Sequence, residues 1–250
     1  MTVRATALRC LAAVPAVGLA VLTYLWLTLP DVRPLRTQNP STTAFIELRA
    51  DEARERGAKP HRVQRWIGYS RISPDLKRAV LVAEDDAFWQ HEGVDFEQLQ
   101  ESLERDWAQW RFVRGGSTIT QQLAKNLYLS PSKNPLRKLR EFVIARRLEA
   151  ELKKARILEL YLNVIEWGDG IYGVEAASHT YFNATAAALG PSESALLAAA
   201  IVNPRIFNPA RPGRGLIRRQ QLILKRMGAV TPPDPVPAPL EPLPQPEPQQ

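Results

Sequence analysis

The chain has 250 residues, of which 45% are hydrophobic, and it carries a formal net charge of +7. This length and apolar content exclude a wholly disordered protein and allow one large domain with appendages. The single cysteine, Cys10, excludes an intrachain disulfide. The positive charge favours an anionic partner, namely nucleic acid, anionic lipid or a phosphorylated substrate, and does not choose among them.

The first element expected in chain order is a membrane anchor over residues 10–29. This run carries no charge, and a helix of about 20 apolar residues spans a bilayer core. Arg4 and Arg9 precede the run, which predicts that residues 1–9 are cytoplasmic and that the rest of the chain lies outside. A cleaved signal peptide is the alternative, but the run is longer than the usual apolar core of about 7–15 residues, which favours an uncleaved anchor.

Residues 30–230 are predicted to form a mainly α-helical domain, because apolar residues recur at helical spacing and alternating strand patterns are scarce. Ser73 and Pro74 are typical of a helix start, and Gly93 can end that helix. The other expected helices cover residues 136–156, 157–163 and 192–202. Residues 231–250 are rich in proline, with glutamate and glutamine, and this composition predicts a disordered tail.

Glu84 is the first candidate for catalysis. It follows Val80 by four residues and lies at the margin of the apolar face of its helix. Partial desolvation there would raise the pKa of the carboxyl toward that of a useful base. Taken alone, the acidic run Glu84–Asp86 is typical of a solvated surface. For His91, a structural hydrogen-bonding role is expected rather than metal binding, because the three histidines of the chain have no zinc-type spacing.

The run Gly115–Asn126, with the sequence GGSTITQQLAKN, is the most informative stretch of the chain. Its two glycines predict a tight turn, and Ser117 predicts an N-cap for the following helix. Thr118, Gln122 and Lys125 would then share one helix face. A separate apolar row consists of Ile119, Leu123 and Leu127. A strip of hydrogen-bonding groups that ends in a cation suits a polyhydroxylated, phosphate-bearing ligand.

Two further stretches carry charge and polarity at helical spacing. Arg137, Lys138 and Glu141 lie three and four residues apart, which predicts either a surface salt-bridge ladder or a carboxylate held beside cations that bind a diphosphate. Downstream, Tyr161, Leu162 and Asn163 are expected to shape the core and the cleft rather than to react. Glu193 is likewise expected to be structural.

Together these stretches resemble the signature motifs of the bacterial peptidoglycan glycosyltransferases, lysozyme-like enzymes that polymerise lipid II. The matching stretches, in the order of the family, are Glu84–Gly93, Gly115–Asn126, Arg137–Glu141 and Lys154–Asn163. The Ser130-x-x-Lys133 pattern has no Lys-Thr-Gly partner, so the resemblance is to the monofunctional enzymes rather than to the two-domain synthases. The resemblance implies a lysozyme-like helical domain.

The resemblance also implies roles for the site residues. Glu84 would be the general base, acting on the 4-hydroxyl of the acceptor sugar. Lys125, Arg137 and Lys138 would stabilise the diphosphate leaving group. Glu141 would be a second catalytic carboxylate that orients these cations or helps to hold a divalent cation, Mg²⁺ or Mn²⁺, and the sequence leaves both readings open. The residues expected to bind substrate are Ser117, Thr118, Gln121, Gln122, Lys125, Asn126, Arg137 and Lys138.

The expected partners are lipid II, the growing glycan strand, the bacterial inner membrane and proteins of cell-wall synthesis. Nucleic acid is not expected, because the predicted topology places the basic domain outside the cytoplasm. One alternative is a glycan-cleaving enzyme, a muramidase or lytic transglycosylase, which would need a protonated carboxylic acid and has no use for a basic strip. A second alternative is a membrane-anchored scaffold that uses the proline-rich tail.

Overall fold

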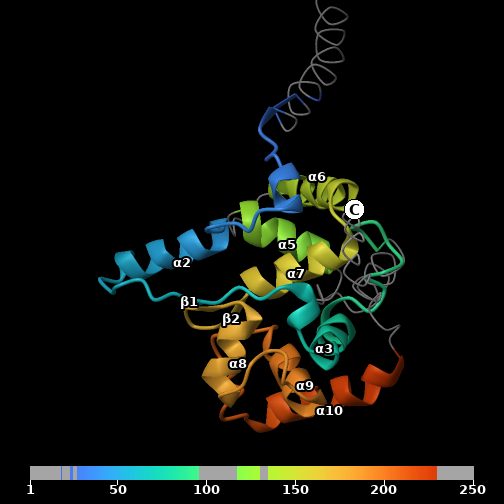
Figure 1. Ribbon diagram of the computed structural model, residues 1–250. Helices are drawn as coiled ribbons and strands as arrows, with labels where there is room; N and C mark the ends of the chain where they lie inside the picture. The colour runs from blue at the N-terminus through green and yellow to red at the C-terminus, as the bar shows by residue number, and fades with distance from the viewer. Residues whose placement is uncertain (1–17, 19–22, 25–26, 96–116, 130–134, 230–250) are drawn as a thin grey trace, which may run out of the picture.

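The computed structural model describes residues 18, 23–24, 27–95, 117–129 and 135–229, which form a mainly helical domain with a small sheet (Figure 1). The α-helices are α2 (Ala44–Glu55), α3 (Pro74–Glu84), α5 (Ile119–Tyr128), α6 (Pro135–Glu151), α7 (Lys154–Val164), α8 (Val174–Phe182), α9 (Pro191–Ala200) and α10 (Arg214–Arg226). Short 3-10 helices cover η1 (Arg33–Arg36), η2 (Tyr69–Arg71) and η3 (Met227–Ala229). The mainly helical fold class is confirmed and is consistent with a lysozyme-like glycosyltransferase.

The predicted anchor and the proline-rich tail lie largely or wholly outside the described residues. Only a few positions of 10–29 are described, and none of 231–250. Within the described ranges, no helix combines the length and the apolar character needed to cross a bilayer. Both segments therefore stay predictions.

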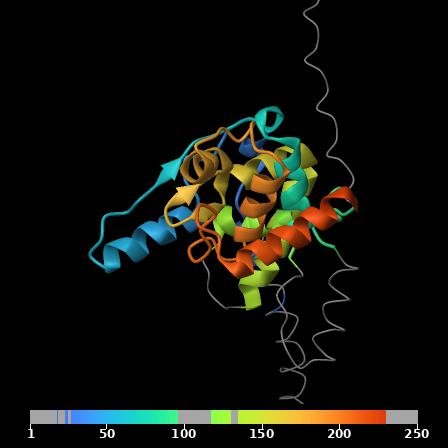
Figure 2. The same ribbon diagram turned by 90° about the horizontal axis from the view of Figure 1, so that it is seen from below.

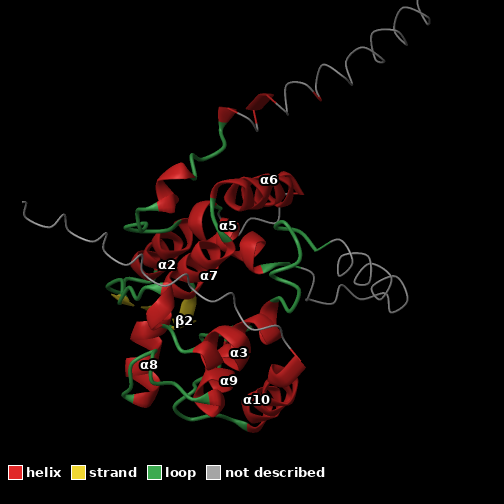
Figure 3. Cartoon of the chain, turned by 45° about the vertical axis from the view of Figure 1, so that its right-hand side comes forward, coloured by secondary structure: helices red, strands yellow, loops and turns green. Residues whose placement is uncertain are grey.

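Apart from α2, the α-helices fall into two groups on either side of the middle of the domain. Helices α5, α6 and α7 lie toward the end where the N-terminal segment enters, and α3, α8, α9 and α10 lie toward the opposite end (Figures 1 and 3). Helix α10 crosses that opposite end (Figure 2). Helix α9 packs against both α3 and α10, and its alanine-rich sequence allows this close approach from two sides. Helix α7 is buried along most of its length, as expected for a helix that has apolar residues on more than one side.

A three-stranded sheet was not expected from the sequence. Its order is β1 (Val63–Gln64), β3 (Ile171–Tyr172) and β2 (Glu166–Gly168), with β1 parallel and β2 antiparallel to β3. Strands of two or three residues are too short to show an alternating pattern, so they escaped detection. Gly173 follows β3 with φ of +79°, and a Cβ there would lie 2.8 Å from the backbone oxygen of Asn163.

Two predicted helix boundaries are wrong. The helix that starts after Ser73 ends at Glu84 rather than at Gly93, because Asp85 leaves the helical conformation and uses its side chain elsewhere. The long helix predicted over residues 136–156 breaks after Glu151, and α7 begins at Lys154.

Candidate active site

The N-terminus of α5 is fixed by a capping box. Thr118, not Ser117, is the N-cap: its Oγ1 accepts the backbone N–H of Gln121 at 3.2 Å, and the Gln121 Oε1 accepts the backbone N–H of Thr118 at 3.2 Å. The Thr118 hydroxyl also donates to the carbonyl of Gly93 at 2.7 Å. Gly115 and Gly116, predicted to form the preceding turn, lie outside the described residues. The expected helix therefore exists, with its start shifted by one residue.

Asp85 ties the end of α3 to the start of α5. Its buried carboxylate accepts the backbone N–H of Ile119 at 2.8 Å, where the positive end of the α5 dipole favours an anion. It also pairs with His91 Nε2 at 2.9 Å. The His91 Nδ1 accepts the N–H of Gly93 at 3.1 Å, so Nε2 carries the hydrogen and donates a hydrogen bond to Asp85. The structural role expected for His91 is confirmed, whereas Asp85 was not singled out from the sequence.

Glu84 is the last residue of α3 and faces α5. Its carboxylate accepts a hydrogen bond from Gln122 Nε2 at 2.8 Å. The Gln122 Oε1 in turn accepts the hydroxyl of Tyr161 at 2.9 Å. Tyr161 is completely buried, and its hydroxyl fixes the Gln122 amide with the nitrogen toward Glu84. Gln122 from α5 and Tyr161 from α7 thus hold the candidate base in one orientation.

The environment of Glu84 favours its protonated form relative to water. Burial raises the pKa of the carboxyl, whereas the Gln122 hydrogen bond and the charges of Arg219 and Lys125 oppose the rise. The charge of Asp85 and the position of Glu84 at the negative end of the α3 dipole act with burial. The predicted direction of the shift is confirmed.

Arg219 was missed by the sequence analysis. It lies on α10, where its Nε donates to the carbonyl of Ala199 at 3.2 Å, and its charge reaches Glu84. The available signal was the amphipathic pattern of residues 214–226, with buried Leu216 and Ile223 among basic residues. That pattern predicts a surface helix but does not indicate that the helix packs next to the end of α3.

A cation cluster on α6 surrounds the second carboxylate. Glu141 is only 3% exposed, accepts a hydrogen bond from Arg137 at 2.8 Å and pairs with Lys138. Lys138 also donates to the Ser117 hydroxyl at 3.1 Å, which links α6 to the start of α5. Because the shared acceptor is buried, this is not a simple surface salt-bridge ladder, whereas binding of a diphosphate by these cations stays a prediction.

The charge of Lys125 interacts with both candidate carboxylates, Glu84 and Glu141. Burial lowers the pKa of its ammonium, and the charges of Glu141 and Glu84 oppose that shift while Arg137 and Lys138 add to it. Within the described part of the chain, its ammonium makes no hydrogen bond. Lys125 therefore remains able to bind an anion beside Glu84.

The other candidate substrate-binding residues have partners inside the protein. Thr118 and Gln121 are buried in the capping box, and Asn126 donates to the backbone carbonyl of Gln122 at 2.8 Å. These contacts position α5. Direct contact of these three side chains with a substrate stays a prediction.

The sequence model of the transglycosylase family matches residues 52–228, which include all of these groups. The chain belongs to the transglycosylase family. A biosynthetic peptidoglycan transglycosylase of Dechloromonas aromatica is 46% identical over 213 residues, covering 85% of this chain and 92% of the relative. One of Aromatoleum aromaticum is 52% identical over 169 residues, covering 68% of this chain and 74% of the relative. The recognition made on the motifs is confirmed, and the chain is a glycosyltransferase.

The fourth motif of this transglycosylase, Lys154–Asn163, makes hydrogen bonds that hold neighbouring segments of the site in place. The Asn163 amide accepts the backbone N–H of Ile67 at 2.8 Å and donates to the carbonyl of Ile67 at 2.9 Å. Tyr161, on the same helix, is the partner of Gln122. Glu193 accepts the N–H of Gly190 at 2.9 Å at the start of α9. The structural roles expected for these residues are confirmed.

A divalent cation does not fit this transglycosylase at Glu141. Such ions need several oxygen ligands, and both oxygens of this carboxylate already face Arg137 and Lys138. Among the residues whose positions are described, no group of three or more His, Cys, Asp or Glu side chains could hold a metal ion. Of the two readings of Glu141, orientation of the cations is the one that its contacts support.

Proposed function

We propose that this chain, by family a peptidoglycan glycosyltransferase of cell-wall synthesis, polymerises lipid II into β-1,4-linked glycan strands and releases undecaprenyl diphosphate. The observation that carries the proposal is the position of Lys125, whose charge acts on both Glu84 and the Glu141 cluster. A base and a group of cations lie next to each other, as the transfer of a sugar from a diphosphate requires.

Glu84 is the general base. It takes the proton from the 4-hydroxyl of the acceptor sugar while that oxygen attacks the anomeric carbon of the donor, and the configuration at this carbon inverts. The raised pKa of Glu84 makes the carboxylate a stronger base than one in water. The hydrogen bond from Gln122 keeps one carboxylate oxygen occupied, so the other is available to the acceptor hydroxyl.

Lys125, Arg137 and Lys138 bind the diphosphate of the donor. Diphosphate is a good leaving group and needs stabilisation of its charge more than a strong acid. Glu141 holds Arg137 and Lys138 from a buried position, so the cations are placed before the substrate arrives. Ser117 joins this group through its contact with Lys138.

A glycan-cleaving enzyme is the second candidate, and the raised pKa of Glu84 is the observation that favours it, because cleavage uses a protonated carboxylic acid. The cation cluster argues against it, since cutting a neutral sugar linkage does not need three positive side chains. Incubation with purified sacculi and, separately, with lipid II distinguishes the two. Release of soluble fragments from sacculi without polymer from lipid II would establish cleavage.

The proposed arrangement in the cell is a single-pass protein of the bacterial inner membrane. Residues 1–9 are cytoplasmic, residues 10–29 cross the membrane, residues 30–230 form the periplasmic catalytic domain, and residues 231–250 form the tail. The uncharged sequence of residues 10–29 supports this arrangement. Protease digestion of spheroplasts tests it, since only an outward-facing domain is cut without lysis.

The Glu84→Gln variant tests the base. It keeps the shape of the side chain and removes the proton acceptor, so polymerisation of lipid II should fall by about 10²- to 10⁴-fold. Asp86→Asn is the matched control, because the neighbouring carboxylate is exposed and pairs with Arg226 at the surface. The control should retain activity. Polymerisation by Glu84→Gln at the rate of the control would show that Glu84 is not the base.

The Lys125→Ala variant tests the diphosphate site. It removes a cation whose charge acts on both Glu84 and Glu141, so turnover should fall while the cooperative unfolding transition is kept. Addition of a primary amine of the size of the missing group should restore part of the activity. A fully active Lys125→Ala enzyme would contradict the role of this ammonium.

A further inference from the structure

The chain that follows the predicted anchor runs along one face of α6. Arg140 donates to the carbonyl of Thr28 at 2.8 Å, and Arg36 pairs with Glu151 eleven residues further along the helix. Residues 140, 147 and 151 share this face, because positions three, four and seven residues apart align on a helix. Helix α6 therefore lies beside the described residues that follow the predicted anchor (Figures 1 and 3).

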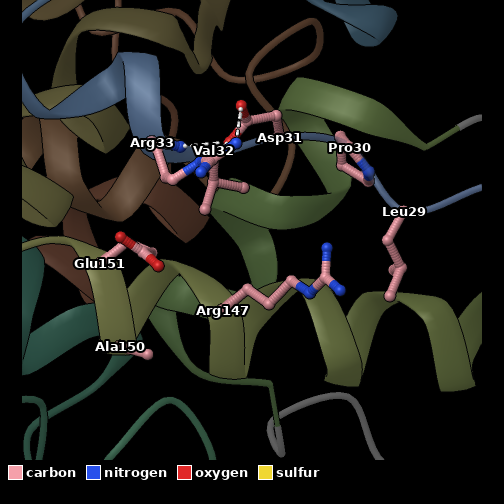
Figure 4. Close-up of a pocket in the computed structure, with 8 residues that line it drawn as sticks. All are labelled: Leu29, Pro30, Asp31, Val32, Arg33, Arg147, Ala150 and Glu151. Atoms are coloured by element: carbon pink, nitrogen blue, oxygen red, sulfur yellow. Dashed lines mark hydrogen bonds and ion pairs between the residues drawn. The ribbon is translucent and has the colours of Figure 1, made fainter. Parts of the chain in front are cut away.

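A cavity of about 370 Å³ lies between this segment and α6. Its lining comes from Leu29–Arg33 on one side and from Arg147, Ala150 and Glu151 on the other. Figure 4 shows the side chain of Arg147 leaving α6 and extending toward Leu29 and Pro30. The cavity thus combines apolar groups near the anchor with a guanidinium.

The two acids in the lining are already neutralised. Arg33 donates to both oxygens of Asp31 at 2.9 Å and holds the pKa of that carboxyl at about 2, with a smaller contribution in the same direction from Arg147. Glu151 pairs with Arg36 outside the cavity. In the described part of the chain, Arg147 has no hydrogen bond or ion pair. Counted together with Arg36, which neutralises Glu151 from outside, the lining leaves the charge of Arg147 uncompensated.

We propose that this cavity binds the phosphate of an anionic phospholipid headgroup, with Arg147 as the group that contacts the phosphate. A guanidinium presents parallel donors that match two phosphate oxygens. Leu29 and Pro30 provide apolar surface for the part of the lipid next to the phosphate. This site is not part of the proposed reaction. It rests on the membrane anchor that forms part of the proposed function, because the anchor places Leu29 at the level of the lipid headgroups.

The test is a thermal unfolding titration of the full chain in a neutral detergent. The added probes are dihexanoyl phosphatidylglycerol, dihexanoyl phosphatidylcholine and inorganic phosphate. With the anionic lipid at ten times its Kd, the unfolding midpoint of the wild type should rise by about 3–6 °C. The other two probes should cause a much smaller rise.

Arg147→Gln should remove this rise. Arg146→Gln is the matched control, because the neighbouring arginine is exposed and pairs with Glu92 instead of facing the cavity. An equal rise in Arg147→Gln, or an equal response of the wild type to phosphatidylcholine or to inorganic phosphate, would overturn the proposal. The wild-type titration decides this even if Arg147→Gln does not fold.

Two further measurements on the same preparations separate this proposal from the others. Lipid II polymerisation reports on the catalytic proposal, and alkaline extraction from membranes reports on the anchor. A lipid-dependent rise without polymerisation would refute only the catalytic proposal. Polymerisation by wild type without any lipid-dependent rise would refute only the headgroup site.

Discussion

The hydrogen bond from Gln122 to Glu84 is expected to control the pH range in which the base is active. The Gln122→Glu variant removes the donor at 2.8 Å and keeps an oxygen that can accept the hydroxyl of Tyr161. The shape of the side chain is nearly unchanged. The perturbation therefore acts on the charge state of Glu84 more than on packing.

The magnitude follows from the kind of bond that is lost. A hydrogen bond to a charged group contributes about 1.5–3 kcal/mol. Since about 1.4 kcal/mol corresponds to a factor of ten, the ratio of ionised to protonated Glu84 at a given pH should fall about 10- to 100-fold. Repulsion by a second carboxylate at position 122 would add to this change.

The assay is lipid II polymerisation as a function of pH. The base works when ionised, so activity is lost as the pH falls through the pKa of Glu84. Loss of the Gln122 donor raises that pKa further, so the acidic limb of the profile moves to higher pH, and the deficit is large in acid and small in alkali. Tyr161→Phe should move the limb less, because it keeps the Gln122 donor and removes only the hydroxyl that orients it.

Two results would refute this reasoning. Profiles of wild type and Gln122→Glu that superimpose would mean that Gln122 does not stabilise the ionised base. A loss of activity that is the same at every pH would mean that Gln122 acts on the substrate or on the fold instead of on Glu84.

Three further predictions concern the free energy of unfolding. Asp85→Ala should lower it by about 3–5 kcal/mol, because the Ile119 N–H and His91 lose a buried anionic partner. Urea denaturation measures this loss, and a value below about 1 kcal/mol would contradict the prediction. Gly173→Ala should cost about 2–4 kcal/mol, since it combines a φ of +79° with a close approach to a carbonyl, whereas Gly213→Ala, at an N-cap with open space, should be nearly neutral in the same thermal melts. Glu84→Gln should be more stable than wild type at neutral and alkaline pH. The folded-state pKa of Glu84 lies above its ordinary value of 4.5, so wild type loses stability as the pH rises from that value through the folded-state pKa. The difference in free energy of unfolding between the two proteins should therefore disappear in acid. A difference that does not depend on pH would argue against a raised pKa.

The sequence predicted the parts of the site that depend on local periodicity. The apolar row of Ile119, Leu123 and Leu127 is buried, as its spacing requires, and the same helix turns Gln122 and Lys125 toward Glu84. The clustering of Glu141 with Arg137 and Lys138 follows from spacing on one helix. Burial of Glu141 does not follow from spacing, and it is burial that excludes a surface ladder.

The parts that escaped prediction are contacts between distant segments. Tyr161 reaches Gln122 from another helix, and Arg219 acts on Glu84 from the far end of the chain. Asp85 stands next to Glu84 in the sequence, but its partner Ile119 is 34 positions away. No periodic pattern encodes such pairs, because they depend on how helices pack after each has formed.

The contacts of Asp85 and Thr118 hold both ends of one stretch of chain at the same place. Asp85 accepts the N–H of Ile119, and Thr118 donates to the carbonyl of Gly93, so Gly93 and Thr118 are fixed side by side although 25 positions separate them in the sequence. The entropy of closing a loop changes slowly with its length, by roughly 0.6 kcal/mol for each doubling. A change of chain length between these two positions is accordingly expected to leave Glu84 and the start of α5 in register, because the contacts that fix both lie outside the altered stretch.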